Sequence, residues 1–492
     1  MSIPDHAAGG TVRSRCTRSA RCAAIALAGL VAASRSDGQR PASAATAPAG
    51  RRPVGSTDEF TLATVGDLIY ARPASAAIER RSPRMLAILR GADLTFGNFE
   101  GTALDLRHFG GSPQAEAGGA WLLAAPAVAA DLRSMGFDLV SRANNHTTDW
   151  GVEGMRSTDE ILDAAGIVHA GTGPSLSAAR APGYLDVPLG RVALLSMASS
   201  FTPMSRAADG LGEVPPRAGV NALRTAVSVV LSRERLAVLR QIRDAPSTPR
   251  GAIAPSPDTS STEVTLFGAH YRASDRIGDG VALEFEMDSS DEQGILRSIR
   301  QARATSDIVI ATIHAHEPGN GSEQPANFLS PLAHAAIDAG ADAFVGHGPH
   351  QLRGIEIYKG RPIFYSLGNF FFQEILQQPL TPDAWAQMRV DPHAANAMTE
   401  AEFDERRRLR YFREDIWYQS VIAVSRYQAG RVAEIRLYPV ELGHDGPDAW
   451  RGVPGMAQPE MARTILERLR RLSQPLGTTI AIEGDVGVIR IP

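Results

Sequence analysis

The chain has 492 residues, of which 43% are hydrophobic and 21% charged, a composition typical of a globular protein with two domains or one large domain with additions. Its net charge of −4 excludes the strongly basic surface that nucleic-acid binding requires. The only lysine, Lys359, is not part of a GxxxxGK[ST] motif, so a P-loop nucleotide site is excluded as well.

Residues 1–50 have the order of segments found in a secretory signal. Four arginines precede the apolar run CAAIALAGLVAA at 22–33, and small residues follow, with cleavage points near Ala44 or Ala47. The run is too short to span a bilayer, so we expect a cleaved leader and an exported protein, periplasmic or extracellular, without a transmembrane helix. A disordered, alanine-rich tail is the alternative. Cleavage would remove Cys16 and Cys22, the only cysteines.

From residue 59 onward, apolar strands alternate with helices, which predicts an α/β fold. The run FTLATV at 60–65 predicts a strand that ends at Gly66-Asp67. Further strands are predicted at 92–98, 137–140, 167–171, 191–199, 307–314 and 342–350. Helices are predicted at 125–136, 154–166, 295–306 and 329–341. A hairpin at 354–372 is predicted to turn at Lys359-Gly360.

Two regions break this alternation. Residues 201–290 are rich in Pro, Gly and Ser, which favours a large insertion or cap, and residues 376–415 are predicted to be irregular. A hairpin is predicted at 416–440, turning at Ala429-Gly430, and a helix with a final strand at 457–492. We therefore expect a leader at 1–50, a domain at 58–375 and a C-terminal extension at 376–492.

Five predicted strands share one feature, a polar cluster where the strand ends. The clusters are Asp67; Asn98 with Glu100; Asn144, Asn145 and His146; His314, His316 and Glu317; and His347 with His350. In open α/β sheets, ligands bind outside the carboxyl ends of the strands. We therefore expect the five clusters to meet at one ligand.

The side-chain types in these clusters indicate metal ions. Carboxylates, amides and imidazoles together suit Zn²⁺, Mn²⁺ or Fe, and hold too much nitrogen for Ca²⁺ or Mg²⁺ alone. The donors exceed what one tetrahedral ion needs, so we expect two divalent ions about 3.5–4 Å apart, bridged by a carboxylate. Such a pair could generate hydroxide at neutral pH.

Each cluster alone also has a structural explanation. Gly66-Asp67 is a common turn, Asn144-Asn145 favours an Asx-turn, and histidines in a Gly/Pro loop can cap carbonyl groups. We interpret Gly368-Asn369 as a turn beside packed aromatics. Six further histidines have no such context and are interpreted as ordinary surface or core residues: His108, His169, His270, His334, His393 and His444. The joint placement of the clusters is what favours a metal site.

The motifs VGDLIY, GNFEG, ANNHTTDWG, IHAHEP and GHGPHQLRGIEIYKGRPIFYSLGNFFF resemble, in order and spacing, those of the CapA family of poly-γ-glutamate capsule biosynthesis proteins. The resemblance covers residues 59–375. That family is similar to the calcineurin-like metallophosphoesterases. The resemblance implies a four-layer αββα sandwich of metallo-dependent phosphatase type with two metal ions, completed by the C-terminal extension.

The resemblance also implies roles for single residues. The implied metal ligands are Asp67, Glu100 in the place of a bridging aspartate, Asn145, His314, His347 and His350. His146 is implied to act as acid or oxyanion stabiliser, and Asp149 to orient it.

Three positions depart from the family pattern. HAHEP stands where the family often has H-x-G-x-E, so whether His316 or Glu317 takes part stays open. Gly348 stands where the family often has a histidine. Ile69 stands where other phosphoesterases carry a histidine, so phosphomonoesterase activity does not follow.

Two functions remain open. The first is an exported metal-dependent hydrolase that acts on a poly-γ-glutamate-like capsule or envelope polymer, at an amide or phosphoester bond. The second is a non-catalytic, metal-binding component of a polymer synthesis or export complex, with residues 201–290 as its docking surface. A serine or cysteine hydrolase is disfavoured because the chain has no GxSxG motif and no cysteine beyond the leader.

Overall fold

The computed structural model describes residues 59–114, 121–188, 190–245, 261–373, 379–394, 398–447 and 449–491. The predicted leader at 1–50 lies outside these ranges. No helix within them is long and apolar enough to cross a membrane.

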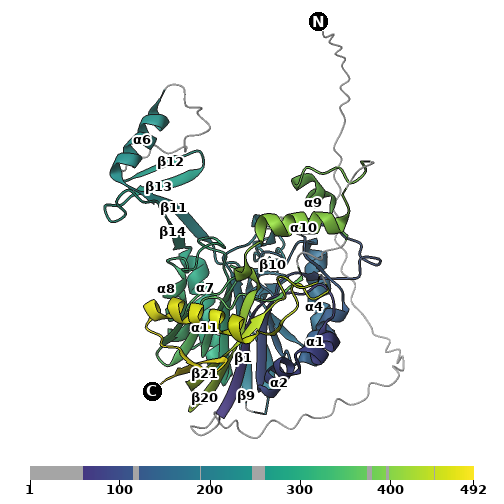
Figure 1. Cartoon of the computed structure of the whole chain (residues 1–492). Coiled ribbons are helices and arrows are strands. Elements are labelled where there is room, and N and C mark those ends of the chain that lie inside the picture. Colours follow the sequence, from purple (N-terminus) through teal and green to yellow (C-terminus); the bar gives the residue numbers. More distant parts are fainter. Residues whose placement is uncertain are drawn as a thin grey trace, which may run out of the picture. The chain divides into compact units, whose positions relative to one another are not determined.

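The described residues form two large β-sheets, seen at the centre of Figure 1. The larger sheet has ten strands: β1 (Glu59–Ile69), β2 (Leu94–Phe99), β5 (Leu139–Ser141), β6 (Val168–Ala170), β19 (Asn369–Phe372), β20 (Gln419–Gln428), β21 (Arg431–Glu441), β22 (Gly455–Met456), β23 (Ala481–Glu483) and β24 (Val486–Arg490). β19, β1, β2, β5 and β6 pair in parallel, while β20 pairs with β1 antiparallel and begins an antiparallel half.

The smaller sheet has six strands within the described ranges: β8 (Gly183–Val187), β9 (Gly190–Ala198), β15 (Ile308–His314), β16 (Ala343–His347), β17 (Ile355–Tyr358) and β18 (Arg361–Phe364). β9, β15, β16 and β18 pair in parallel. The hairpin β17–β18 turns at Lys359 and Gly360, both with positive φ, as predicted.

Side chains alternate between the two faces of each sheet, and this alternation builds the layers. Leu62 of β1 and Leu194 of β9 belong to one buried core between the sheets. Val65 of β1 faces outward onto α1 (Ser75–Arg81), α2 (Pro83–Gly91), α3 (Ala127–Met135) and α4 (Gly151–Ala164). Leu195 of β9 faces α7 (Ser289–Thr305) and α8 (Leu329–Asp338). The order is helix, sheet, sheet, helix, which confirms the predicted αββα sandwich.

The C-terminal residues join this sandwich. The predicted hairpin is confirmed as β20–β21, with positive φ at Ala429 and Gly430. Helix α11 (Pro459–Ser473) inserts Ile465 and Leu469, four residues apart, into the core between the sheets.

The predicted end of the first strand at Gly66-Asp67 is wrong, because β1 runs on to Ile69. A Cβ atom on Gly66 would lie 1.8 Å from the carbonyl oxygen of Gly368, so only glycine permits this approach of the two chains. The Asp67 N–H donates to that oxygen at 3.0 Å, and Asp67 pairs with Asn369 of β19. Pairing with β19, which lies about 300 residues further along the chain, thus extends β1.

Residues 376–415 are not irregular where they are described, since they hold α9 (Pro382–Gln387) and α10 (Glu400–Tyr411). Thr399 and Glu402 form a capping box at the start of α10, and Phe403 packs on Trp121 and Trp385. Local capping and three aromatic side chains therefore order a charged segment.

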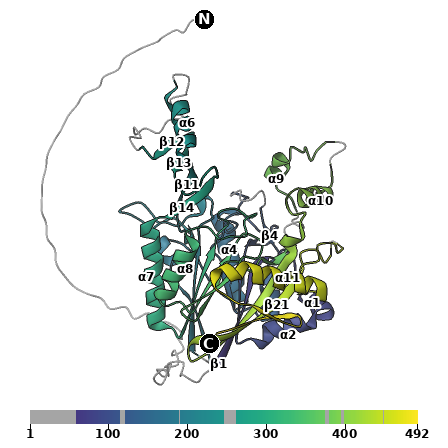
Figure 2. The ribbon, with the colours of Figure 1, turned by 60° about the vertical axis from the view of Figure 1, so that its left-hand side comes forward.

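Residues 201–290 include a small four-stranded sheet of β11 (Thr225–Leu231), β12 (Glu263–Leu266), β13 (Ala269–Ala273) and β14 (Ala282–Met287), with α6 (Arg233–Asp244) beside it. Figures 1 and 2 both draw this group apart from the two large sheets. Asn327, two residues before the start of α8, hydrogen-bonds both backbone groups of Phe285 in β14. Shorter elements are β3 (Thr102–Ala103), β4 (Leu123–Ala124), β7 (Thr172–Gly173), β10 (Gly219–Val220) and α5 (Leu176–Ala179).

Candidate metal centre

Strand register places the polar clusters in two rows. Asp67 and Asn98 lie opposite each other near the carboxyl ends of the parallel strands β1 and β2, and Asp67 also pairs with Asn369, the first residue of β19. His314 of β15 lies opposite His347 of β16 in the other sheet. Both rows are fully buried, and they face each other, since His347 Nδ1 is 3.7 Å from Asp67 Oδ1.

Asp67 is held from two sides. Its Oδ1 accepts from Asn98 Nδ2 at 2.8 Å, and its Oδ2 accepts from the Gly348 N–H at 3.0 Å. Burial raises the pKa of Asp67 to about 7, and these hydrogen bonds lower it only in part. Gly348 has φ +115° and lies against the Ala315 backbone, so a side chain there would be strained in this loop. Gly348 supports the site through its backbone.

Glu100, which follows β2, is 1% exposed, and neither carboxylate oxygen has a hydrogen-bond partner among the described residues. His314 Nε2 lies 3.7 Å and His146 Nε2 3.8 Å from its Oε1. Burial, followed by repulsion from Asp67, raises the pKa of Glu100 well above its usual value. A buried carboxylate without hydrogen bonds is unfavourable unless a proton or a cation compensates it.

Three histidines turn one ring nitrogen outward and the other toward the centre. Thr312 Oγ1 donates to the Val345 carbonyl, so at 2.8 Å it must accept from His347 Nε2, which leaves Nδ1 with the lone pair. His316 Nδ1 donates to Asn320 at 2.6 Å.

His350, with φ +59°, donates from Nδ1 to Asn369 Oδ1 at 2.9 Å. Outward partners of this kind orient the histidines of metal sites.

His314 lies between these rings. Its Nδ1 is 3.0 Å from His347 Nδ1, and its Nε2 is 3.0 Å from His316 Nε2. Asn98 Nδ2, a donor only, lies 3.3 Å from His314 Nδ1, which places a lone pair there as well. Two lone pairs that face each other at 3.0 Å repel, and a shared cation would remove the repulsion.

Burial lowers the pKa of all four imidazoles, to about 4 for His316 and about 3 for His347. They are therefore neutral near pH 7, the form that binds metal.

The loop after β5 supplies the remaining residues. Asn144 Oδ1 accepts from the backbone N–H of His146 at 3.1 Å, and Asn144 Nδ2 donates to Asn98 Oδ1 at 3.3 Å. Asn145 is 8% exposed, and its Oδ1 has no partner among the described residues. His146 Nδ1 lies 2.7 Å from Asp149 Oδ2, which also accepts from the Leu122 N–H. Burial raises the pKa of Asp149 to about 6.

Among the described residues, three groups of side chains at this centre could each hold an ion, with ligand atoms within 4.8 Å of one another: Asp67, His314 and His347; Glu100, His314 and His316; and Asp67, Glu100 and His350. A fourth group, Asp415, His444 and Asp445, shares no residue with them. All of the predicted carboxylate and histidine ligands occur in the three groups at this centre. Lone-pair nitrogens and unpartnered buried oxygens fit a divalent metal. His316, which the sequence left open, belongs to one group, whereas Glu317 accepts hydrogen bonds from Ser199 and Ser200 at 2.9 Å.

Asn369 was missed as a site residue. The packed aromatics beside it exist as predicted, but the predicted turn at Gly368-Asn369 is wrong, because Asn369 begins β19. Its side chain accepts from His350 and donates to the Trp417 carbonyl. The available signal was its position, since it starts a buried strand beside β1.

The comparisons with known proteins agree on one family. The profile of the family described as "Bacterial capsule synthesis protein PGA_cap" matches residues 61–374. The uncharacterized protein y4sH of Sinorhizobium fredii is 48% identical over 88% of this chain and 94% of its own length. The capsule biosynthesis protein CapA of Bacillus anthracis is 24% identical over 64% of this chain and 61% of its own length.

Among solved structures, a 5'-nucleotidase precursor from Thermus thermophilus matches 85% of this chain and 59% of its own, with 12% identity and a TM-score of 0.31.

Proposed function

The chain belongs to the PGA_cap family of bacterial capsule synthesis proteins, and from this premise we propose that it is a metal-dependent hydrolase acting on a poly-γ-glutamate-like polymer of the capsule or cell envelope. The observation that carries the proposal is the buried Glu100 carboxylate, which has no hydrogen-bond partner among the described residues and lies between two imidazoles. A bound cation would compensate the charge of this carboxylate, whose burial is otherwise unfavourable.

In this proposal, two divalent ions, Mn²⁺, Zn²⁺ or Fe, would be held by Asp67, Glu100, Asn145, His314, His347 and His350, and we add His316 as a further ligand. The overlap of the three candidate groups supports two ions, because Asp67 and Glu100, each with two carboxylate oxygens, both belong to two groups. When bound, such ions act as Lewis acids and lower the pKa of water.

We assign proton transfer to His146. Asp149 accepts a hydrogen bond from the N–H at Nδ1 of His146. The other ring nitrogen, Nε2, therefore faces Glu100 and the centre. From there it can deliver a proton to a leaving group or stabilise negative charge on a reacting oxygen. Asp149 acts through His146, because its Oδ2 is shared between that ring and the Leu122 N–H.

The test is turnover by the purified chain loaded with Mn²⁺ or Zn²⁺. We expect it to cleave γ-linked glutamate oligomers, with activity lost on chelation and restored by the same metal. A panel of phosphodiesters run in parallel decides between amide and phosphoester chemistry. Full metal occupancy without turnover of either class would overturn the hydrolase assignment.

The alternative, a non-catalytic component of a synthesis or export complex, is favoured by one observation. The small sheet of β11–β14 exposes Val227, Phe267, Val281 and Leu283, with 43% to 63% of each side chain accessible. If this function holds, cells carrying His146→Ala should still make polymer, and cells carrying Phe267→Ser with Val281→Ser should not. The reverse pattern supports the hydrolase.

We also propose that residues 1–50 direct export to the periplasm or cell surface, on the basis of their arginine, apolar and small-residue segments. N-terminal sequencing of the protein from fractionated cells tests this. A mature start near Ala44 or Ala47 is expected, and an intact N-terminus in the cytoplasmic fraction would refute export.

A further inference from the structure

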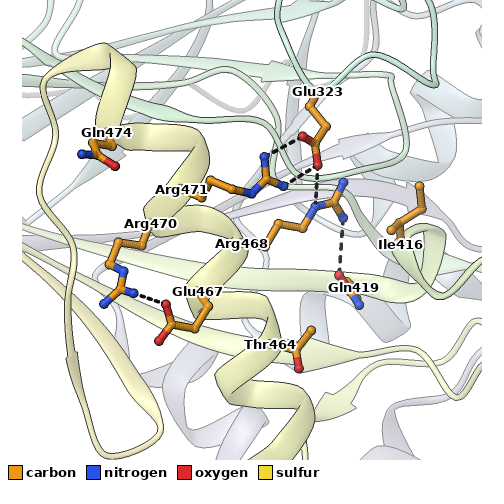
Figure 3. A pocket seen from close by; sticks show the side chains of 9 residues that line it. All are labelled: Glu323, Ile416, Gln419, Thr464, Glu467, Arg468, Arg470, Arg471 and Gln474. Atoms are coloured by element: carbon orange, nitrogen blue, oxygen red, sulfur yellow. Dashed lines mark hydrogen bonds and ion pairs between the residues drawn. The ribbon is translucent and has the colours of Figure 1, made fainter.

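Gln419 lines two cavities whose walls differ in charge. Figure 3 shows the larger one, of about 640 Å³, where three arginines of α11 form ion pairs with Glu323 and Glu467. The charged groups of that cavity therefore already have protein partners. The smaller cavity, of about 250 Å³, has an acidic wall and shares no residue with the metal centre.

The wall of the smaller cavity carries excess negative charge. Its ionisable side chains include three carboxylates, one guanidinium and one imidazole: Asp415, Glu441, Asp445, Arg81 and His444. Three carboxylates against one guanidinium leave two negative charges in excess. A divalent cation would balance this charge, and the imidazole adds a nitrogen ligand of the kind that Zn²⁺ and Mn²⁺ accept.

Two separate segments bring the ligands together. Asp415 begins the 3₁₀-helix η4 (Asp415–Tyr418), whereas His444 and Asp445 lie in a turn that follows β21. The Gly446 N–H closes this turn by donating to the Gly443 carbonyl at 3.0 Å, and Gly443 has φ +63°, which favours glycine. The two central residues of a tight turn thus face the start of η4.

The imidazole of His444 has the geometry of a metal ligand. Its Nδ1 lies 2.7 Å from Asp415 Oδ1 and 3.2 Å from Asp445 Oδ1. Both ring nitrogens are buried, yet neither makes a hydrogen bond with the described residues, so at these distances the oxygens must lie off the direction of an N–H bond. Ligand atoms that bind one ion at about 2.0–2.2 Å lie roughly 3 Å apart, which is the spacing found here.

The inner wall adds a second unsatisfied polar group. Tyr418 lines the same cavity, is only 2% exposed, and has its ring centroid 4.7 Å from that of His444. Its hydroxyl group makes no hydrogen bond of normal geometry with the described residues. Buried polar groups without partners are costly, and a cation that carries water molecules would supply partners to the hydroxyl group as well as to the imidazole.

We propose that Asp415, His444 and Asp445 bind a divalent cation, Zn²⁺ or Mn²⁺, at a site separate from the metal centre. The two aspartate side chains are 57% and 95% exposed, so this ion should exchange with solvent and bind more weakly than ions at the buried centre. Ions that stay with the chain through dialysis therefore report the centre, and added ions report this site.

The bound ion would stabilise a segment that supports the metal centre. η4 also carries Trp417, whose carbonyl accepts a hydrogen bond from Asn369 Nδ2 at 3.0 Å. Asn369 in turn accepts from His350 Nδ1. By joining Asp415 to the turn after β21, the ion would hold η4 in the position that these hydrogen bonds require. This role is structural, and it does not depend on whether the centre hydrolyses a polymer.

The experiment is a calorimetric titration of the dialysed full chain with Zn²⁺. Wild type should bind one further equivalent, and its melting temperature should rise as this equivalent binds. His444→Gln and Asp445→Asn should each weaken the binding of this equivalent by at least about tenfold, because each removes a ligand. The ions that resist dialysis, measured by elemental analysis, should be unchanged. Asp445 is so exposed that Asp445→Asn is expected to fold like wild type.

The matched control is His393→Gln, which removes an imidazole from an exposed position outside the cavity and should titrate like wild type. The inference would be overturned if wild type bound no further equivalent. Full retention of that equivalent in both His444→Gln and Asp445→Asn would overturn it too. The titration needs no turnover, so this site and the hydrolase assignment can fail independently of each other.

Discussion

The two sheets contribute different chemistry to the candidate metal centre. The ten-stranded sheet and its loops bring buried carboxylates to the centre, Asp67 and Glu100, whereas the six-stranded sheet brings imidazoles, with His314 and His347 in one row. Burial raises the carboxyl pKa values of the first half and lowers the imidazole pKa values of the second. We call these the oxygen half and the nitrogen half.

The difference teaches that neither half is complete alone. Burial favours protonated carboxyl groups in the oxygen half and disfavours imidazolium in the nitrogen half. In both halves, the charged form of the side chain is therefore unfavourable. A divalent cation placed between them stabilises the carboxylates and uses the lone pairs of the neutral rings. The predictions below test whether the two halves act as this division requires.

The largest effect is expected from removing a shared ligand. Asp67 belongs to two of the three candidate groups and His350 to one. Asp67→Ala should therefore lose nearly all bound metal and His350→Ala about half, by elemental analysis, with turnover falling more than about a hundredfold in both. Asp163→Ala, an exposed carboxylate on α4, serves as control. Equal metal retention in the two site variants would mean that Asp67 is not shared.

The division into halves was only partly predictable from sequence. Asp67, Glu100, His314 and His347 were predictable because an apolar strand that ends in a costly polar residue is a local pattern. Asn369 was not, because Gly-Asn is equally typical of a turn, and its contact with His350 depends on the pairing of β19 with β1.

The fold, too, was predictable only where it depends on local sequence patterns. The alternation of strands and helices indicated the sandwich, since it depends on local periodicity. The order of α10 depends on Trp121 and Trp385, which lie elsewhere in the chain, and the small sheet pairs β11 with β14 across more than 50 residues. The structure of such segments depends on tertiary contacts, and these contacts cannot be predicted from the composition of the segment.

Next in size is the proton-transfer pair. His146→Ala should lower the turnover rate by about 10²–10⁴-fold while metal content stays unchanged, because proton transfer is lost and the ligands remain. Asp149→Asn should lower it less, since the ring keeps its place but loses its charged partner. Rate and metal content measured on the same samples check both variants. Metal loss in His146→Ala would instead make His146 a ligand of the oxygen half.

Each half contains one buried arginine that supports its backbone. Arg142 donates to the carbonyls of Phe99 and Gly101, on either side of Glu100, at 3.2 and 2.8 Å. Arg353 donates to three carbonyls of the loop after His316: Glu317, Gly319 and Ser322. Each arginine therefore fixes the backbone that presents one half of the centre.

Replacing either arginine with methionine should weaken metal binding by about 10–100-fold, the usual effect of losing a supporting contact. Arg142→Met should weaken Mn²⁺ binding more than Zn²⁺ binding, because Mn²⁺ depends more on oxygen ligands, and Arg353→Met should show the opposite order. Titrations with the two metals measure this. The same order in both variants would show that the halves are not separable.

The smallest effect concerns protons released when metal binds. Burial raises the pKa of Asp67 to about 7 and that of Glu100 well above its usual value, so the metal-free oxygen half favours neutral carboxylic acid at pH 6. His316 and His347, with pKa values of about 4 and about 3, are already unprotonated at that pH. Metal binding at pH 6 must therefore release protons from the oxygen half only, and affinity should rise with pH and level off above the carboxyl pKa values. Infrared difference spectra should lose the protonated-carboxyl band on addition of Zn²⁺, while ¹⁵N NMR shows neutral imidazoles before and after. An imidazolium signal from His316 or His347 at pH 6 would contradict the division, since the nitrogen half would then hold the proton that its burial should exclude.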